Sequence, residues 1–118
     1  MNPRDRLALA LDVPSAKEAL ELVDEITESF QYYLLKASNQ LAIEKGKCQY
    51  FEKTKYSDGI LPIDTYKKDL DKIVKRKLSY DWKELRKDIQ EHGLRHSTLS
   101  AQMPSESSSV VSNATNGI

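Results

Sequence analysis

The sequence predicts a helix-rich α/β chain, and three features of its 118 residues support this class. Strict alternation of leucine and alanine at residues 6–12 is typical of a buried strand. Three longer segments carry apolar residues at helical spacing, and two of these begin with a Ser or Asp followed three positions later by Glu. A second segment of β type, residues 97–101, precedes a serine-rich C-terminal stretch.

The composition excludes several classes of protein. Lys and Arg together number 18 and Asp and Glu also number 18, so there is no excess positive charge for gripping nucleic acid or a membrane surface. No apolar run approaches the ~20 residues that cross a membrane. The single cysteine, Cys48, excludes an internal disulfide, and the N-terminus has no signal-peptide pattern. We therefore expect a cytoplasmic chain.

The first helix is expected to begin at Ser15, where Glu18 completes a capping box. Its expected buried face consists of Ala19, Leu22, Val23 and Ile26. A second helical pattern begins near Thr27 and ends before Gly46, a residue suited to a helix C-terminus. The expected buried face of that pattern consists of Phe30, Tyr33, Leu34, Ala37 and Leu41. Periodicity leaves open whether these patterns form one long helix or two.

Two further helices are expected after a loop at residues 47–62. The first spans residues 64–77, and its inward side chains would be Tyr66, Leu70 and Ile73. The second spans residues 81–93, opens with a second capping box and has an apolar face of Trp82, Leu85 and Ile89.

None of the reactive side chains predicts catalysis or a metal site. His92 and His96 lie on either side of a glycine, so they share no helical face, and no acidic or cysteine cluster stands at ligand spacing. Cys48 has neither a base partner nor a second cysteine, which favours an inert thiol. In the pair Tyr32–Tyr33, we expect Tyr33 to face the core and Tyr32 to be wetter.

Two polar features have two interpretations each. The basic run at residues 75–77 is either a solvated surface or a grip for phosphate. Asp12 ends the first predicted strand, where βα enzymes place functional groups, and it is equally suited to terminating that strand.

The C-terminal stretch LSAQMPSESSSVVSNATNGI, residues 99–118, predicts an anion-binding turn. Serine side chains cap helix starts, and the first amides of a helix together with the positive end of its dipole attract negative charge. The alternative interpretation is a serine-rich C-terminal tail.

From about residue 28 onward, the chain resembles the catalytic large subunit of class I ribonucleotide reductase. The resemblance is carried by FQYYLLKASNQLAIEKGKCQYF, GILPIDTYKKDLD, YDWKELRKDIQEHGLRHSTLSAQMPSESSS and SNATNGI. It implies that residues 28–118 are a fragment of a reductase barrel, and hence a partial α/β barrel. It also implies that the serine-rich turn binds the diphosphate of a ribonucleoside diphosphate, through Ser105, Glu106, Ser107 and Ser108.

The same resemblance implies that the chemistry lies elsewhere in the family's barrel. The radical cysteine, the reducing cysteine pair and the radical-transfer tyrosines of the family have no counterpart in this segment; Cys48 and Tyr32–Tyr33 do not match them. We therefore expect no catalytic residue, no metal and no cofactor in the chain, and no turnover by the chain alone.

Residues 1–26 resemble a different family, orotidine 5′-phosphate decarboxylase, through RLALALDVPSAKEALELVDEI. The resemblance implies that Asp12 contacts a substrate ribose. The Asp-x-Lys-x-x-Asp cluster of that family is absent, so decarboxylation does not carry over. The expected organisation is a decarboxylase-like βα unit at residues 1–27, as a leader or fused segment, and a reductase fragment at residues 28–118.

The function expected from these observations is that of a ribonucleotide reductase fragment that supplies a substrate-phosphate turn. Its expected partner is a complementary reductase fragment, or a second copy bound through open strand edges at residues 7–11 and 98–101. The alternatives are a non-catalytic recombined domain that binds phosphate or nucleotide weakly and, more remotely, a decarboxylase-like protein.

Overall fold

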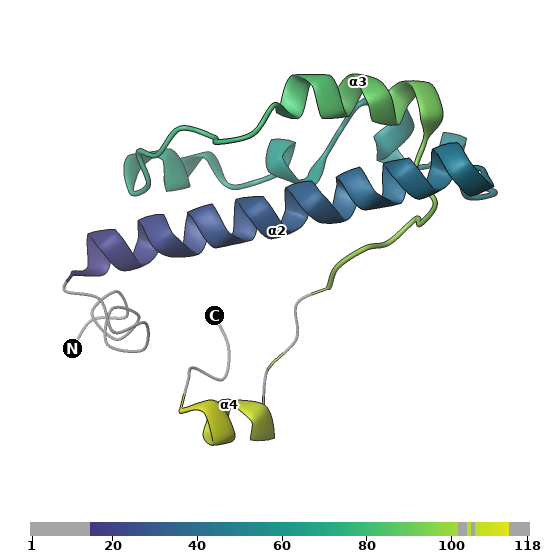
Figure 1. Ribbon diagram of the computed structural model, residues 1–118. Helices are drawn as coiled ribbons and strands as arrows, with labels where there is room; N and C mark the ends of the chain where they lie inside the picture. Colours follow the sequence, from purple (N-terminus) through teal and green to yellow (C-terminus); the bar gives the residue numbers. More distant parts are fainter. Residues whose placement is uncertain (1–14, 102–103, 105, 114–118) are drawn as a thin grey trace.

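The computed structural model describes residues 15–101, 104 and 106–113. Over these residues the fold is helical: the long α2 (Ala16–Lys45) lies beside α3 (Trp82–His92), and the short α4 (Ser107–Ser112) stands apart from both (Figure 1). Between α2 and α3 the chain forms four 3-10 turns, at Phe51–Lys53, Lys55–Asp58, Pro62–Asp64 and Lys68–Lys72. No described helix, α2 included, combines the length and the apolar character needed to cross a membrane.

The predicted α/β class is wrong, because the described residues form helices and no β-strand. The expected partial barrel with strands is therefore not seen in this part of the chain. Residues 97–101 are irregular, since a strand requires a neighbouring segment that supplies its backbone hydrogen bonds. Among the described hydrogen bonds this segment has one, in which Ser100 Oγ donates to Gln31 Oε1 of α2 at 3.1 Å. The other predicted strand, residues 6–12, lies outside the described residues.

The two helical patterns of the N-terminal half form one continuous helix, α2. Ser15 caps its start, as predicted, because Ser15 Oγ accepts a hydrogen bond from the Glu18 amide at 3.2 Å. Helical structure continues through Thr27 and ends at Gly46, as the sequence indicated. Gly46 has a φ of 88° and donates its amide to the Ala42 carbonyl at 2.8 Å. The junction between the two resemblances thus lies inside a regular helix.

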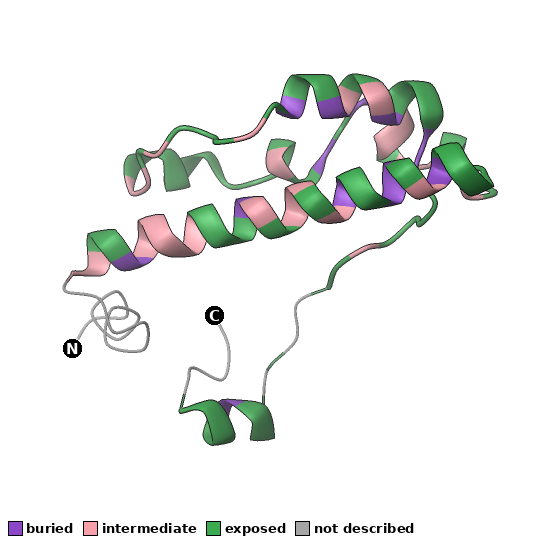
Figure 2. Ribbon diagram, in the orientation of Figure 1, coloured by how far each residue is buried: buried purple, intermediate pink, exposed green. Residues whose placement is uncertain are grey.

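Apart from Ala19, which is buried as predicted, the buried residues of α2 are not the ones that the apolar pattern predicted. Its buried residues are Ala19, Glu28, Leu35, Ser38, Asn39 and Ala42, and most of these lie along the side facing α3 (Figure 2). In contrast, Ile26, Phe30 and Tyr33 are 57%, 62% and 56% exposed. Ser38 forms side-chain hydrogen bonds with His96, and Asn39 with the carbonyls of Asp88 and Gly93; Ala42 is also buried. Periodicity identifies an apolar face, but it does not show which face a neighbouring element covers.

The predicted helix at residues 81–93 is confirmed as α3. Asp81 caps it, with Asp81 Oδ1 accepting from the Glu84 amide at 3.0 Å. Trp82, Leu85 and Ile89 are buried, as predicted. The remaining members of this core cluster are Leu35, Phe51, Leu61 and Leu94.

The predicted helix at residues 64–77 is wrong. The chain forms only 3-10 turns there, and Tyr66 and Leu70 are exposed. Asp64 closes the first turn by accepting from the Leu61 amide at 2.8 Å, and Arg86 of α3 donates to its other carboxylate oxygen. The Lys68–Lys72 turn buries no residue, so no packed apolar face stabilises a helix in this segment.

Candidate functional site

The candidate phosphate turn is the start of α4. Three of its four predicted residues, Glu106, Ser107 and Ser108, are consecutive and exposed at this point; the fourth, Ser105, lies outside the described residues. Glu106 precedes the helix with a φ of 48°, a left-handed conformation that is uncommon outside glycine. Its carbonyl accepts from both the amide and the hydroxyl of Ser109, at 3.1 and 2.5 Å. These bonds close the first turn of α4, which contains Ser107 and Ser108.

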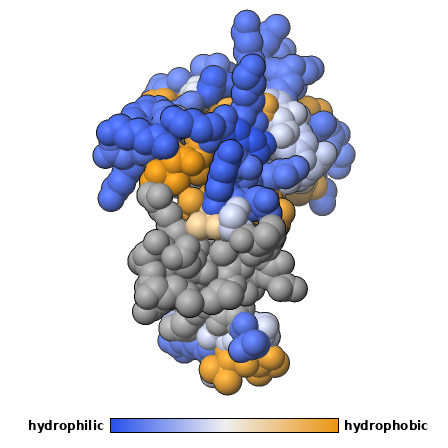
Figure 3. Space-filling view, turned by 90° about the vertical axis from the view of Figure 1, so that its left-hand side faces the viewer, coloured by the Kyte–Doolittle hydropathy of each residue, from blue (hydrophilic) through white to orange (hydrophobic). Residues whose placement is uncertain are grey.

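Behind the serines, α4 exposes an apolar surface. Val110 and Val111 are 81% and 89% exposed, and Figure 3 shows hydrophobic side chains on the outer end of α4. A six-residue helix with exposed valines gains little from packing within the chain. The start of α4 follows a segment that leaves the helical body after α3.

That segment, residues 94–101, is called the arm here. It begins at Leu94, which is fully buried in the core and accepts from the Cys48 amide at 2.8 Å. Arg95 Nη1 donates to the carbonyls of Lys45 and Gly46, at 3.4 and 3.2 Å, which satisfies groups at the C-terminal end of α2. Leu99 is partly buried against the core. The arm therefore starts from the hydrophobic core of the described residues.

Glu28 is a buried carboxylate with several hydrogen-bond partners, and sequence reasoning missed it. Its Oε1 accepts from the Ser79 amide at 2.8 Å and from Trp82 Nε1 at 2.9 Å. Its Oε2 is ion-paired with the guanidinium of Arg76, which also contacts Asp24 Oδ2 at 3.0 Å. One feature of the sequence could have indicated that Glu28 is buried. It lies seven residues, or about two helical turns, before Leu35 and is therefore on the same side of α2.

These contacts control the ionisation of Glu28. Burial alone would raise the pKa of this carboxyl group, but the hydrogen bonds from Arg76, Trp82 and Ser79 outweigh burial and lower the pKa below its ordinary value of 4.5. Hydrogen bonding and ion pairing with Glu28 raise the pKa of Arg76 in turn. Because Arg76 is engaged by two carboxylates, the centre of the basic run at residues 75–77 fastens that segment to α2. This contact does not support the phosphate-grip interpretation.

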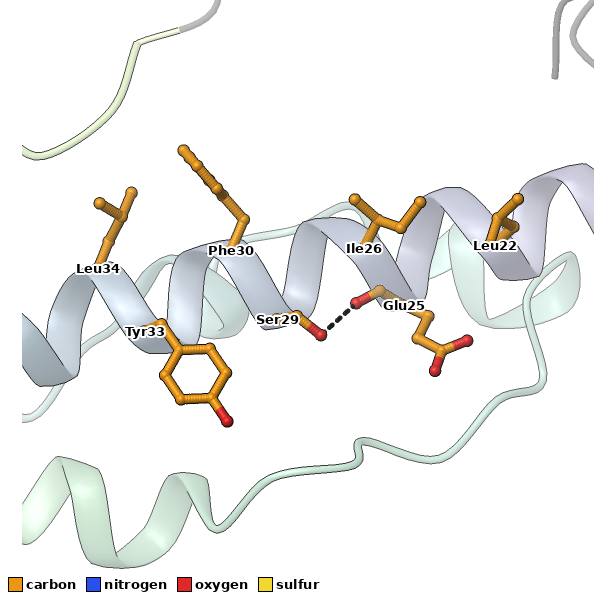
Figure 4. A pocket seen from close by; sticks show the side chains of 7 residues that line it. All are labelled: Leu22, Glu25, Ile26, Ser29, Phe30, Tyr33 and Leu34. Carbon is orange, nitrogen blue, oxygen red and sulfur yellow. Dashed lines mark hydrogen bonds between the residues drawn. The ribbon is translucent and has the colours of Figure 1, made fainter.

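The unpaired side of α2 carries a shallow apolar hollow. Figure 4 shows Leu22, Ile26, Phe30 and Leu34 in a row along one side of the helix. On the adjacent side lie Tyr33 and Ser29, whose Oγ donates to the Glu25 carbonyl at 2.9 Å. The row crosses residue 27 without a break, so side chains on both sides of the expected junction form a single apolar surface.

Tyr32 and Cys48 pack against the core cluster. Tyr32 stacks on Tyr80, with ring centroids 4.6 Å apart, and packs against the core, whereas Tyr33 is exposed; the predicted order of the two is reversed. Cys48 is a partly buried free thiol. In the described part of the chain no three His, Cys, Asp or Glu side chains gather as a metal site would need. Asp12 lies outside the described residues.

The sequence matches known proteins over most of its length. The family model described as "Ribonucleotide reductase, barrel domain" matches residues 8–118. The chain belongs to the ribonucleotide reductase family. It is 64% identical over 100 residues to the ribonucleoside-diphosphate reductase subunit alpha of Haemophilus influenzae, and 63% identical over 100 residues to subunit alpha of reductase 1 of Escherichia coli. Each match covers 85% of this chain and 13% of the relative.

A more distant reductase subunit alpha, from Enterobacteria phage T4, is 50% identical over 109 residues, which is 92% of this chain and 14% of that protein. The chain thus spans about 13% of the length of the bacterial reductase subunits named above. The reductase family match extends on both sides of residue 27. The division into a decarboxylase-like unit and a reductase fragment stays a prediction.

Proposed function

We propose that this chain is an internal segment of a ribonucleotide reductase alpha subunit and contributes the turn that binds the substrate diphosphate. The family match over residues 8–118 supports the first half of the proposal. The observation that carries the second half is the consecutive, exposed placement of Glu106, Ser107 and Ser108 at the start of α4. Amides and hydroxyls at such a position are suited to an anionic group. Ser105 completes the proposed set.

In this proposal the chain binds but does not react. The described residues include one thiol, Cys48, and no cluster of metal ligands. Reduction of a ribose carbon requires two electrons, which a pair of thiols supplies when it is oxidised to a disulfide. A single partly buried thiol cannot form such a pair within this chain. The ribonucleoside diphosphate would therefore be held here by its phosphate end, and its ribose would be reduced by residues of the remaining subunit.

The proposed partner is the complementary part of a reductase subunit. The apolar row at Leu22, Ile26, Phe30 and Leu34, in which Ile26 and Phe30 are exposed and the two leucines half-buried, supports this, because contiguous apolar surfaces mark interaction sites. The family description names a barrel domain, and a barrel helix needs a second layer against its apolar side. This chain's helices supply one layer. Mixing the chain with the complementary fragment and assaying reduction of a ribonucleoside diphosphate tests the pairing. If the mixture shows no turnover and the two fragments do not associate, the proposed pairing is contradicted.

The binding turn is tested separately by nuclear magnetic resonance. We expect pyrophosphate or ADP to shift the amide signals of Ser107 and Ser108 in the full chain, and a Ser107→Ala/Ser108→Ala double variant to lose the response. A Ser57→Ala variant is the control, because Ser57 bonds carbonyls of its own turn, far from α4 in sequence. Absent shifts, or shifts that persist in the double variant, would contradict the proposed site. Binding without any pairing to a complementary fragment would favour the alternative of a non-catalytic phosphate-binding domain.

A further inference from the structure

The side chain of Ser38 holds the arm at its root. Ser38 is 1% exposed, and its Oγ accepts from the His96 amide at 3.2 Å and pairs with His96 Nδ1 at 3.0 Å. The backbone carbonyl of the same residue accepts from the Arg95 amide at 3.1 Å. One position of α2 therefore contacts two successive residues of the arm, and one of its hydroxyl contacts is with a side chain.

These contacts fix the direction in which the arm leaves the core. The next polar contact joins Ser100 to Gln31, which lies seven residues before Ser38 on α2. Seven helical residues span about 10 Å and four extended residues span about 13 Å, so the arm can follow α2 from one contact to the other. Figure 1 shows the arm leaving near the C-terminal half of α2 and running back toward its N-terminal side.

Asn39, the neighbour of Ser38, binds the C-terminal end of α3 and not the arm. Its Nδ2 donates to the carbonyls of Asp88 and Gly93, at 3.1 and 2.9 Å, and thereby fastens the end of α3. Ser38 instead contacts only the arm among the described hydrogen bonds outside its own helix. Because the Ser38 hydroxyl is shielded from water, its hydrogen bonds are not exchanged for bonds to solvent as the exposed Ser100 contact can be.

We propose that Ser38, acting through His96, is a positioning residue for the serine-rich turn: it fixes the root of the arm that carries this turn. The inference rests on the proposed function for the meaning of the turn, but the anchoring itself is a property of the arm. In this proposal the Ser38–His96 pair determines the position of α4 and of the serine-rich turn at its start. Neither residue contacts the proposed phosphate.

Amide hydrogen exchange on the full chain tests the anchor directly. In a Ser38→Ala variant, we expect the His96 amide to exchange about five- to tenfold faster, since its acceptor is lost. The Arg95 amide should stay protected, because alanine retains the carbonyl that it bonds. Ser29→Ala is the matched control, a serine of the same helix whose hydroxyl pairs with Tyr80 and not with the arm.

A second variant guards against misfolding of the first, because His96 is exposed and its replacement leaves the core intact. We expect His96→Ala to shift the amide signals of residues 97–101, and His96→Asn to restore them, since the Asn side-chain oxygen can occupy the place of Nδ1. Wild-type signals in His96→Ala would overturn the proposal. So would a Ser38→Ala variant whose α3 amides lose protection as much as the arm does.

Pyrophosphate titration separates this inference from the proposed function. If the wild-type turn binds pyrophosphate, we expect its dissociation constant to rise about fivefold in Ser38→Ala and His96→Ala, and to be unchanged in Ser29→Ala and His96→Asn. Unchanged binding in the first two variants would overturn the positioning role. If the wild-type chain binds no pyrophosphate, the proposed function fails for this chain, and the exchange data alone decide whether Ser38 anchors the arm.

Discussion

Trp82 at the start of α3 donates its indole Nε1 to Glu28 Oε1 of α2 at 2.9 Å, and both side chains are buried. The same carboxylate oxygen accepts from the Ser79 and Tyr80 amides, at 2.8 and 3.3 Å. Arg76 neutralises the other oxygen. A single carboxylate therefore fastens the whole approach to α3, residues 76–82, onto α2. Such a group stabilises the fold only while all of its partners are present.

Replacing Glu28 by Gln should destabilise the chain by about 2–3 kcal/mol at neutral pH, because the largely buried Arg76 guanidinium loses one of its two carboxylate partners. Urea unfolding followed by Trp82 fluorescence would measure the change in the free energy of unfolding. Glu25→Gln, on the exposed side of the same helix, is the control and should change it by less than about 0.5 kcal/mol. Equal stability of the two variants would contradict the assigned role of Glu28.

Acid should weaken the wild-type chain through the same group. The pKa of Glu28 is lowered in the folded chain, whereas in the unfolded chain it lies near 4.5. The contribution of Glu28 is therefore complete above pH 4.5 and is lost as the pH falls through the folded-state pKa. Unfolding free energies measured from pH 7 to pH 3 should fall more steeply for wild type than for Glu28→Gln. Parallel curves would show that the pKa of Glu28 is not lowered by folding.

Local signals predicted the ends of α2 and α3 well, whereas the helix predicted to begin at residue 64 does not form. Ser15 and Asp81 cap α2 and α3 with bonds to amides three residues ahead, and Gly46 ends α2 where expected. These features depend on neighbours within one turn of the chain, so the sequence contains all the information needed. The apolar face of α3 was predicted equally well, because it has one strong stripe: Trp82, Leu85 and Ile89.

Features that depend on distant segments were not predictable from the same patterns. The buried side of α2 is decided by contacts between Glu28 and Trp82, and between Asn39 and Gly93, which are 54 residues apart in each case. Residues 97–101 have the composition of a strand but no strand partner among the described residues. The self-association hypothesis thus loses its strand edge at residues 98–101. Of the candidate site, the cluster Glu106–Ser108 came from the motif, whereas the Ser38–His96 anchor required the structure.

Gly93 and Gly46 offer a matched test of close packing at helix ends. Both follow a helix with similar backbone angles, at φ 80° and 88°, and both donate their amide to the carbonyl four residues back. A Cβ at Gly46 would meet nothing within 4 Å, whereas one at Gly93 would lie 2.7 Å from Lys47 Cβ. Gly46→Ala should therefore cost about 1–3 kcal/mol through backbone strain alone.

Gly93→Ala should cost clearly more than Gly46→Ala, because Lys47 Cβ is close to its backbone and cannot move aside as a side-chain tip can. Thermal unfolding of both variants measures the difference. If Gly46→Ala proved equally or more destabilising, the close approach of Lys47 to Gly93 would be incorrect.

Asn39→Ala should separate the end of α3 from α2. The variant leaves the buried Gly93 carbonyl and a second acceptor at Asp88 without their side-chain donor, at a cost of about 2 kcal/mol. Amides in the last turn of α3 should exchange faster, which hydrogen exchange would detect. The control is Gln40→Ala, the next residue, which is exposed and bonds only Glu44 in the described contacts. Similar behaviour of both variants would contradict the role of Asn39.

The exposed row on α2 should drive association without stabilising the fold of this chain. Ile26 and Phe30 are more than half exposed, so an Ile26→Gln/Phe30→Gln variant should change the free energy of unfolding by less than about 1 kcal/mol. The wild-type chain should associate as its concentration rises, because the row forms a continuous apolar surface, and the variant should associate less. Sedimentation velocity measures this difference, with Thr27→Gln, a solvent-exposed change on the same helix, as the control.

A wild-type chain that stays monomeric at every concentration would contradict self-association through this row. If the variant also bound a complementary reductase fragment more weakly than the wild-type chain does, the row would be identified as the surface that this fragment covers.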